Sequence, residues 1–156
     1  MFLNEIFLCR YDKIKPYGFP IHGSIDGFSR YIIWLRVGTT NNDPKVVGGY
    51  YVDAIKKLNG FPRCVRSDHG TENVLVKSFQ NTLKEKYSDS SHPAHLYGSS
   101  PNNQRIEAFW GQLRKQSIQF FMNLFQKLKE DNSFDGGEID KAVLRYCFLE
   151  LIQVCN

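Results

Sequence analysis

Two carboxylates, Asp68 and Glu107, occupy positions from which they could take part in chemistry. Asp68 lies in the stretch RSDHGTEN (66–73), where a predicted buried strand ends and a turn begins. A side chain at the end of such a strand projects into the crevice in which α/β sheets bind ligands, and Gly70 permits a close approach of the backbone. The ordinary alternative is a structural aspartate in a strand-to-helix turn.

Glu107 lies in the stretch NQRIEAFW (103–110), in the first turns of a predicted long helix. Apolar residues at positions i, i+3, i+4 and i+7 define one packed face of this helix. Glu107 flanks that face, so we expect the edge of the core to hold it firmly. The alternative is a solvated glutamate, which the helix macrodipole favours near an N-terminus. The packed face comprises Ile106, Phe109, Trp110 and Leu113.

Basic side chains follow on the same predicted helix. Arg114 comes seven residues after Glu107, and a rotation of about 700° returns it to nearly the same side. A cation there could hold a phosphate next to a carboxylate-bound metal. The alternative is that Arg114 and Lys115 form a solvated basic face. The net charge of +4, from 20 basic and 16 acidic residues, permits a polyanionic partner without demanding one.

The elements that must position these residues follow the order β-β-β-α-β-α-β-α-α. Aromatic and β-branched residues predict strands at 19–25 and 31–37, and the turn signal between them indicates an antiparallel hairpin. Asp43 and Pro44 mark the start of a helix, and Thr71 can cap the next one. This order predicts a mixed sheet with helices on both faces. The other expected elements are strands at 5–10, 63–66 and 94–97, and helices at 44–58, 71–84, 103–131 and 138–154.

The last of these helices is amphipathic, and its pattern places six residues on one apolar face. These residues are Ile139, Val143, Leu144, Cys147, Leu151 and Val154.

Composition and length indicate one ordinary globular domain. The chain has 156 residues, of which 42% are hydrophobic and 23% charged. The four cysteines lack the C-x-x-C spacing of zinc fingers and redox pairs, and His92 and His95 lack partners for a zinc site. No run approaches the roughly 18 apolar residues of a membrane span, and residues 1–9 lack the features of a signal peptide. We therefore expect an intracellular protein with reduced thiols and no membrane association.

Three motifs in order resemble those of one known family. IDGFSRYI (25–32) is similar to its second-strand motif, RSDHGTEN to its second catalytic Asp motif, and NQRIEAFW to its Glu helix. The family is the integrase catalytic core domain of retroviruses, retrotransposons and related transposases, and the resemblance is strongest to integrase-core proteins encoded in animal genomes. It covers about residues 11–155, which leaves 1–10 as an atypical N-terminal segment and 11–156 as the core-like domain. Glu107 lies 39 positions after Asp68, close to the spacing usual in the family.

This resemblance implies an RNase H-like fold, with a five-stranded mixed sheet flanked by helices. It also implies two divalent ions, Mg²⁺ or Mn²⁺, held by two Asp and one Glu, among them Asp68 and Glu107. Two such ions stabilise the attacking and leaving oxygens of an in-line phosphoryl displacement. Water as the nucleophile gives end processing, and a DNA 3′-hydroxyl gives strand transfer. The partners implied are DNA and a second copy of the chain in a homodimer. The expected DNA substrate implies a location in the nucleus. The residues expected to contact DNA are Arg105, Arg114 and Lys115.

The first strand departs from the family pattern. In FLCRYDK (7–13) the YDK matches, but Cys9 stands where the first catalytic Asp is expected and Arg10 replaces a Gly. A thiol is a poor ligand for Mg²⁺, so the loss of this carboxylate should leave at least one ion weakly held. Asp12 is a weak substitute, because an odd offset along a strand points to the opposite face.

The sequence leaves several interpretations open. The leading one is a DNA-binding integrase core, derived from a mobile element, that has lost catalysis; the chain could instead be a fragment with a different first exon. A second is a non-catalytic protein-interaction domain, for which the aromatic stretch FFMNLF (120–125) could supply a surface, unless it simply packs in the core. A third is a metal-dependent nuclease on the same fold.

Overall fold

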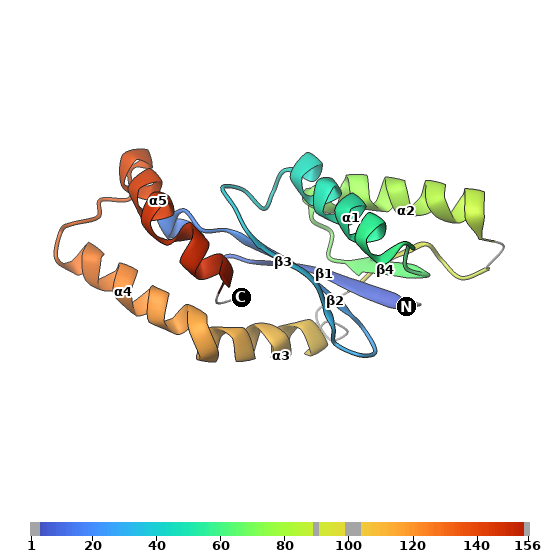
Figure 1. Cartoon of the computed structure of the whole chain (residues 1–156), viewed down its shortest axis with the longest axis horizontal. Coiled ribbons are helices and arrows are strands. Elements are labelled where there is room, and N and C mark those ends of the chain that lie inside the picture. Colours follow the sequence, from blue (N-terminus) through green and yellow to red (C-terminus); the bar gives the residue numbers. More distant parts are fainter. Residues whose placement is uncertain (1–3, 89–90, 99–103, 155–156) are drawn as a thin grey trace.

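Five strands form one mixed sheet in the computed structural model, which describes residues 4–88, 91–98 and 104–154. The strand order is β3-β2-β1-β4-β5 (Figure 1). β2 runs antiparallel to both β1 and β3, whereas β1, β4 and β5 run parallel to one another. The expected RNase H-like arrangement is thereby confirmed. The strands are β1 (Glu5–Tyr11), β2 (Ile21–Asp26), β3 (Ile32–Val37), β4 (Cys64–Ser67) and β5 (His95–Tyr97).

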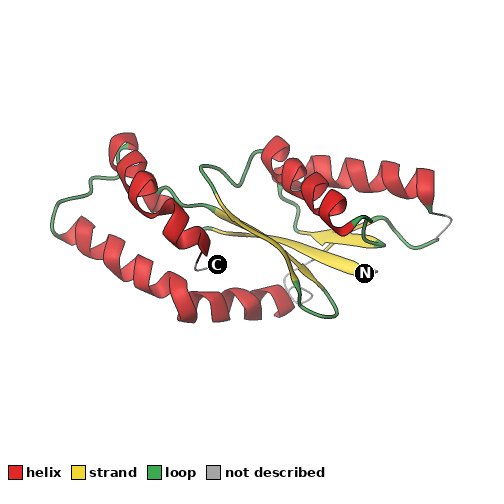
Figure 2. Ribbon diagram, viewed as in Figure 1, coloured by secondary structure: helices red, strands yellow, loops and turns green. Residues whose placement is uncertain are grey.

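Helices cover both faces of this sheet (Figure 2). α1 (Pro44–Leu58) and α2 (Val74–Tyr87) lie side by side over one face, and the 3-10 turn η2 (Thr71–Asn73) leads into α2. The other face carries α3 (Gln104–Leu113), the π-helical turn η4 (Arg114–Ile118), α4 (Gln119–Glu130) and α5 (Glu138–Val154). A further 3-10 turn, η1 (Lys15–Tyr17), follows β1. Within the described ranges, no helix is long and apolar enough to cross a membrane.

Strand β1 divides the core into two clusters, because its side chains alternate between the faces of the sheet. Ile6 and Leu8 pack with α1 and α2, whereas Phe7 and Tyr11 pack with α3, α4 and α5. Cys9 belongs to the second set and is partly buried against it. Because neighbouring side chains of a strand point to opposite faces, Cys9 lies on the face covered by α3 and Arg10 on the face covered by α1 and α2.

The ends of α1 follow the sequence expectation. The Asp43 side chain accepts a hydrogen bond of 2.8 Å from the backbone N–H of Lys45, Pro44 opens the helix, and Asn59 ends it in a left-handed conformation. The expectation for Thr71 differs from the structure. Thr71 lies inside the 3-10 turn η2 rather than capping α2, because that turn adds three residues before the helix begins.

The long helix expected at 103–131 is interrupted. The π-helical turn η4 separates α3 from α4, and the Ser117 hydroxyl donates to the Leu113 carbonyl at 3.3 Å within it. Figure 1 shows the chain changing direction between the two helices. Apolar spacing predicts helical backbone in this stretch but carries no signal for one wider turn.

Helix α5 has the expected bounds but a different packed face. Leu144 and Ile152 are buried, and Phe148 packs edge-on against Phe121 and Phe125. Of the six residues on the face read from the pattern, only Leu144 is buried; the other five are exposed. Apolar residues occupy both sides of α5. Their helical spacing therefore predicted a helix but did not show which side packs toward the sheet.

The outer edge of the sheet is occupied by one side chain from α5. The Gln153 amide donates to the Leu35 carbonyl at 2.8 Å and accepts from the backbone N–H of Val37 at 3.0 Å. β3 is the edge strand, and Gln153 thus satisfies two of its outward-facing backbone groups.

Candidate active site

Cys9 lies near the end of β1, the central strand of the sheet. The residue paired with Cys9 on the adjacent strand β2 is Gly23. A Cβ atom at that glycine would lie 2.9 Å from Cη2 of Trp110. The absence of a side chain at Gly23 therefore lets the Trp110 ring settle against the sheet beside Cys9. The ring also stacks on Tyr11, with centroids 5.0 Å apart. The expected packing of Trp110 and Leu113 toward the core is confirmed, since both are buried.

Burial, together with the negative charges of Asp68 and Glu107, raises the pKa of the Cys9 thiol to about 11. The Trp110 indole N–H and the Arg10 guanidinium act in the opposite direction. Nε1 of Trp110 is buried near the Cys9 sulfur, but the two atoms do not meet the geometric criteria of a hydrogen bond. The thiol, which donates to the Arg10 carbonyl at 3.3 Å, is therefore neutral at physiological pH. Asp68 and Glu107 thus lie near enough to Cys9 for their charges to act on its thiol.

Asp68 follows β4, as the sequence predicted, and its carboxylate is fixed by local hydrogen bonds. Oδ1 accepts from the backbone N–H of Gly70 and from Nδ2 of Asn73, each at 3.1 Å. A Cβ atom at Gly70 would collide with the carboxylate of Glu72, so a larger residue there would displace this buried side chain.

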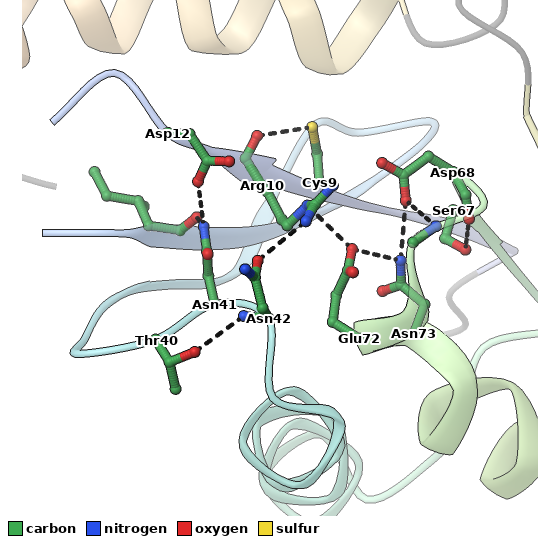
Figure 3. A network of polar contacts seen from close by, with 12 residues as sticks. Cys9, Arg10, Asp12, Thr40, Asn41, Asn42, Ser67, Asp68, Glu72 and Asn73 are labelled. Atoms are coloured by element: carbon green, nitrogen blue, oxygen red, sulfur yellow. Dashed lines mark hydrogen bonds and ion pairs between the residues drawn. The ribbon is translucent and has the colours of Figure 1, made fainter. Parts of the chain in front are cut away.

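Behind Asp68 lies a polar network that sequence reasoning missed (Figure 3). Nδ2 of Asn73 also donates to Oε1 of Glu72 at 3.1 Å, and the same Glu72 oxygen lies 3.2 Å from Nε of Arg10. The Glu72 side chain is only 2% exposed, and that of Arg10 is 32% exposed. Arg10 also donates to Oδ1 of Asn42 at 3.0 Å. Glu72 is part of the motif RSDHGTEN, but no feature of the sequence indicated that it pairs with Arg10, 62 positions earlier.

Asp12, the weak substitute for the missing carboxylate, contacts a different set of residues. Its Oδ1 accepts from Nδ2 of Asn41 at 2.7 Å, and its Oδ2 lies 3.7 Å from Nζ of Lys15. Across the part of the chain that the structure describes, these are its polar side-chain partners. Neither contact joins Asp12 to Cys9 or Asp68, and a role of Asp12 as the third carboxylate stays a prediction.

The predicted residues of the Glu helix lie partly outside the described side chains. Glu107 is exposed on α3, whereas the side chain of Arg105 is not described. Arg114 and Lys115 are exposed on η4, and Nε of Arg114 donates to Oε1 of Gln119 at 2.9 Å. Arg114 also lowers the pKa of Tyr11, which burial raises, so its charge lies near the end of β1.

The donor set does not fit Mg²⁺ or Mn²⁺. Among the described residues, no group of three His, Cys, Asp or Glu side chains gathers closely enough to hold an ion. The neutral, soft thiol of Cys9 takes the place of a hard oxygen ligand, and one Asp68 oxygen already accepts two hydrogen bonds. Nε2 of His95 is bonded to Oγ of Ser67 at 3.1 Å, and His92 lies in the loop before His95.

The fold and these motifs match one protein family. The integrase core domain family is matched over residues 8–155, which is nearly the whole chain. The chain therefore belongs to the integrase core domain family.

Solved structures of two viral integrases share the fold. The HTLV-2 integrase catalytic core domain in complex with magnesium, in its dimeric form, is 18% identical, with a TM-score of 0.52 over 93% of this chain and 86% of that one. Its trimeric form is 16% identical, with a TM-score of 0.51 over 93% and 84%. A chain of the simian T-cell lymphotropic virus intasome in complex with PP2A regulatory subunit B56 gamma is 15% identical, with a TM-score of 0.53 over 92% and 47%. At these identities the likeness is one of fold. Comparison with curated proteins gave no match.

Proposed function

We propose that this chain is an integrase-type core that binds DNA at the end of the sheet bearing Asp68, and that Cys9 disables metal-dependent strand transfer. The observation that carries the proposal is the neutral thiol of Cys9, on which the charges of Asp68 and Glu107 act. In-line phosphoryl displacement by two ions requires hard oxygen ligands. A centre that offers a thiol in place of one carboxylate holds Mg²⁺ or Mn²⁺ weakly at Asp68 and Glu107.

Charge and placement support DNA as the partner. The chain carries a net charge of +4, and Arg114 and Lys115 are exposed on the turn that follows the Glu107 helix. Arg105, on that helix, completes the proposed contact set. A related chain comes from an intasome, which also favours a nucleic-acid partner. Contacts of this kind are made mainly to phosphates and are therefore salt-sensitive.

A second function, self-association, is favoured by one specific observation. Helix α5 presents an exposed apolar face that includes Ile139, Val143, Tyr146 and Val154. Exposed apolar residues gathered along one helix favour an interaction site. We propose that this face pairs with a second copy of the chain to form a homodimer, whereas FFMNLF packs mainly inward through Phe121 and Phe125.

The origin and the location follow from the same proposal. The DNA-recombining ancestry of the family and the altered Cys9 site favour a mobile-element domain of the kind encoded in animal genomes, kept after catalysis was lost. A protein whose partner is DNA is then expected in the nucleus.

Binding and turnover of labelled duplex DNA test this proposal. We expect the wild type to bind duplex DNA in the presence of EDTA, with affinity that falls as salt rises, and to cut or join no strand with Mg²⁺ or Mn²⁺. The Cys9→Asp variant should bind Mn²⁺ about tenfold more tightly or better by titration calorimetry, because a hard ligand replaces a soft one.

Two further variants give the decisive controls. Asp68→Asn and Glu107→Gln, introduced into Cys9→Asp, should abolish the gain in Mn²⁺ affinity. Metal-dependent cutting by the wild type that disappears in Asp68→Asn would establish an active enzyme instead. Dimerisation without any DNA affinity would favour the interaction domain.

A further inference from the structure

An aromatic and basic cluster lies beside Asp68, where the parallel strands β4 and β5 end. His69, the residue after Asp68, stacks on Tyr97 with ring centroids 4.2 Å apart and an interplanar angle of 14°. Nζ of Lys77, from α2, lies 3.2 Å from Oη of Tyr97 and 4.8 Å from the centre of its ring. These three side chains come from a turn, a strand and a helix, so the tertiary fold assembles the His69–Lys77–Tyr97 cluster.

Two hydrogen-bond donors of this cluster remain able to bind a ligand. The Lys77 ammonium has three N–H donors and gives one to Oη of Tyr97. Because Oη accepts that bond, the phenol O–H is left to donate outward. The two donating atoms are 3.2 Å apart, close enough to bind oxygens of one anion. In the described part of the chain no carboxylate forms an ion pair with Lys77, so its charge is not neutralised.

The cluster rests on a rigid base. The ring of His95 meets that of Tyr97 edge-on, with centroids 4.8 Å apart, and Nε2 of His95 is bonded to the buried Ser67 at 3.1 Å. Tyr97 nevertheless keeps 45% of its surface exposed, and His69 is exposed as well. The structure thus fixes an aromatic platform and still presents it to solvent.

We propose that the His69–Lys77–Tyr97 cluster is a subsite for one unpaired nucleotide of a DNA strand that lies beside Asp68. Lys77 and Tyr97 hold its phosphate, and the exposed ring of His69 stacks on its base. This inference rests on the proposed DNA binding and extends it to a part of the surface distant in sequence from Arg105, Arg114 and Lys115. An unpaired base is required because a base within a duplex has both faces covered.

Fluorescence anisotropy with a labelled single-stranded oligonucleotide and with its blunt duplex tests the subsite. Lys77→Met should weaken binding of both probes about five- to tenfold and reduce the salt slope by about 0.7–0.9, the loss of one phosphate contact. Tyr97→Phe, which keeps the ring and removes only the hydroxyl, should weaken both about threefold. His69→Ala should weaken the single strand about fivefold or more and leave the duplex nearly unchanged.

Lys86→Met is the matched control, because Lys86 lies on the same helix and contacts the Tyr87 ring at 5.2 Å in the same kind of interaction. Lys77→Met and Lys86→Met with equal effects would overturn the subsite while leaving the proposed DNA binding intact. Equal effects of His69→Ala on both probes would overturn the base-stacking assignment. A wild type that binds neither probe at low salt would overturn the proposed function together with the subsite. Thermal melts of each variant verify that it is folded.

Discussion

Arg10 compensates the buried charge of Glu72 in the network behind Asp68. Removing one partner of a buried pair costs roughly 3–5 kcal/mol, and the partial exposure of Arg10 reduces that figure. We expect Arg10→Met to lower the free energy of unfolding by roughly 1–3 kcal/mol in urea titrations, because among the described residues Glu72 would keep only its bond from Asn73.

The matched control for this variant is Lys141→Met. Lys141 pairs with Glu138 at 2.9 Å on the exposed surface, where an ion pair adds little stability. If the two variants unfold alike, Arg10 does not stabilise Glu72 in the way described.

His22 makes the stability of the protein depend on pH. It is fully buried on β2, accepts a 3.0 Å hydrogen bond from Nε1 of Trp34, and has its pKa lowered to about 4, mainly by burial. Between that value and the ordinary 6.5, the unfolded chain binds the extra proton, so the free energy of unfolding falls as pH falls. We expect a loss of roughly 2 kcal/mol from this residue between about pH 7 and pH 5.

Urea unfolding of the wild type and of His22→Gln at both pH values measures this effect. The variant should lose less stability on acidification, and the remaining dependence includes His95, whose pKa burial also lowers to about 4. Identical losses in the two proteins would exclude His22 as a source.

At the residue scale, sequence reasoning located the candidate site through motifs and missed what holds it. Asp68, Glu107 and Cys9 were identified by position, and the charges of Asp68 and Glu107 act on the Cys9 thiol. Their roles in metal binding stay predictions. Arg10 and Glu72 were missed, because an ion pair across 62 residues leaves no periodic trace in one sequence.

Trp110 of α3 packs closely against β2 at Gly23. At Gly23 an added methyl group would lie 2.9 Å from the Trp110 ring and 3.2 Å from Cδ1 of Leu35. We expect Gly23→Ala to cost roughly 1–3 kcal/mol in urea titrations, since a close-packed core must shift to admit it.

Gly111→Ala is the matched control on α3, because a Cβ there has no neighbour within 4 Å. This change should leave stability unchanged or raise it by roughly 0.5–1 kcal/mol through helix propensity. Equal destabilisation by the two substitutions would contradict the packing argument.

At the element scale, the strands and helix ends followed from local chemistry. Asp43 caps α1 as its side-chain type predicts, and the hairpin of β2 and β3 follows its turn signal. The π-helical turn η4 and the orientation of α5 did not follow. The orientation of α5 depends on which of its apolar side chains meets Phe121 and Phe125 of α4, and that contact is set by tertiary packing. The apolar spacing gave no signal for the wider turn η4.

At the scale of the whole molecule, the apolar face of α5 is exposed to solvent. The role of this face in self-association can be tested. Val143→Glu places a charge on that face, where Val143 is 55% exposed. Sedimentation velocity should show a concentration-dependent dimer for the wild type and a monomer for the variant, with unchanged thermal stability.

Val74→Glu provides the comparison, since Val74 is 50% exposed on α2, away from this face. This control should dimerise like the wild type. A wild type that stays monomeric at every concentration would exclude the α5 interface.

The Gln153 amide, from α5, covers backbone groups of the edge strand β3 that could otherwise pair with another chain. An amide that donates to Leu35 and accepts from Val37 reproduces the two bonds that one residue of a parallel neighbour strand would make. When α5 detaches, the edge loses this substitute strand and offers its backbone groups to any extended chain nearby. Local unfolding of α5 would therefore expose this edge to pairing with another chain while the sheet itself is still folded.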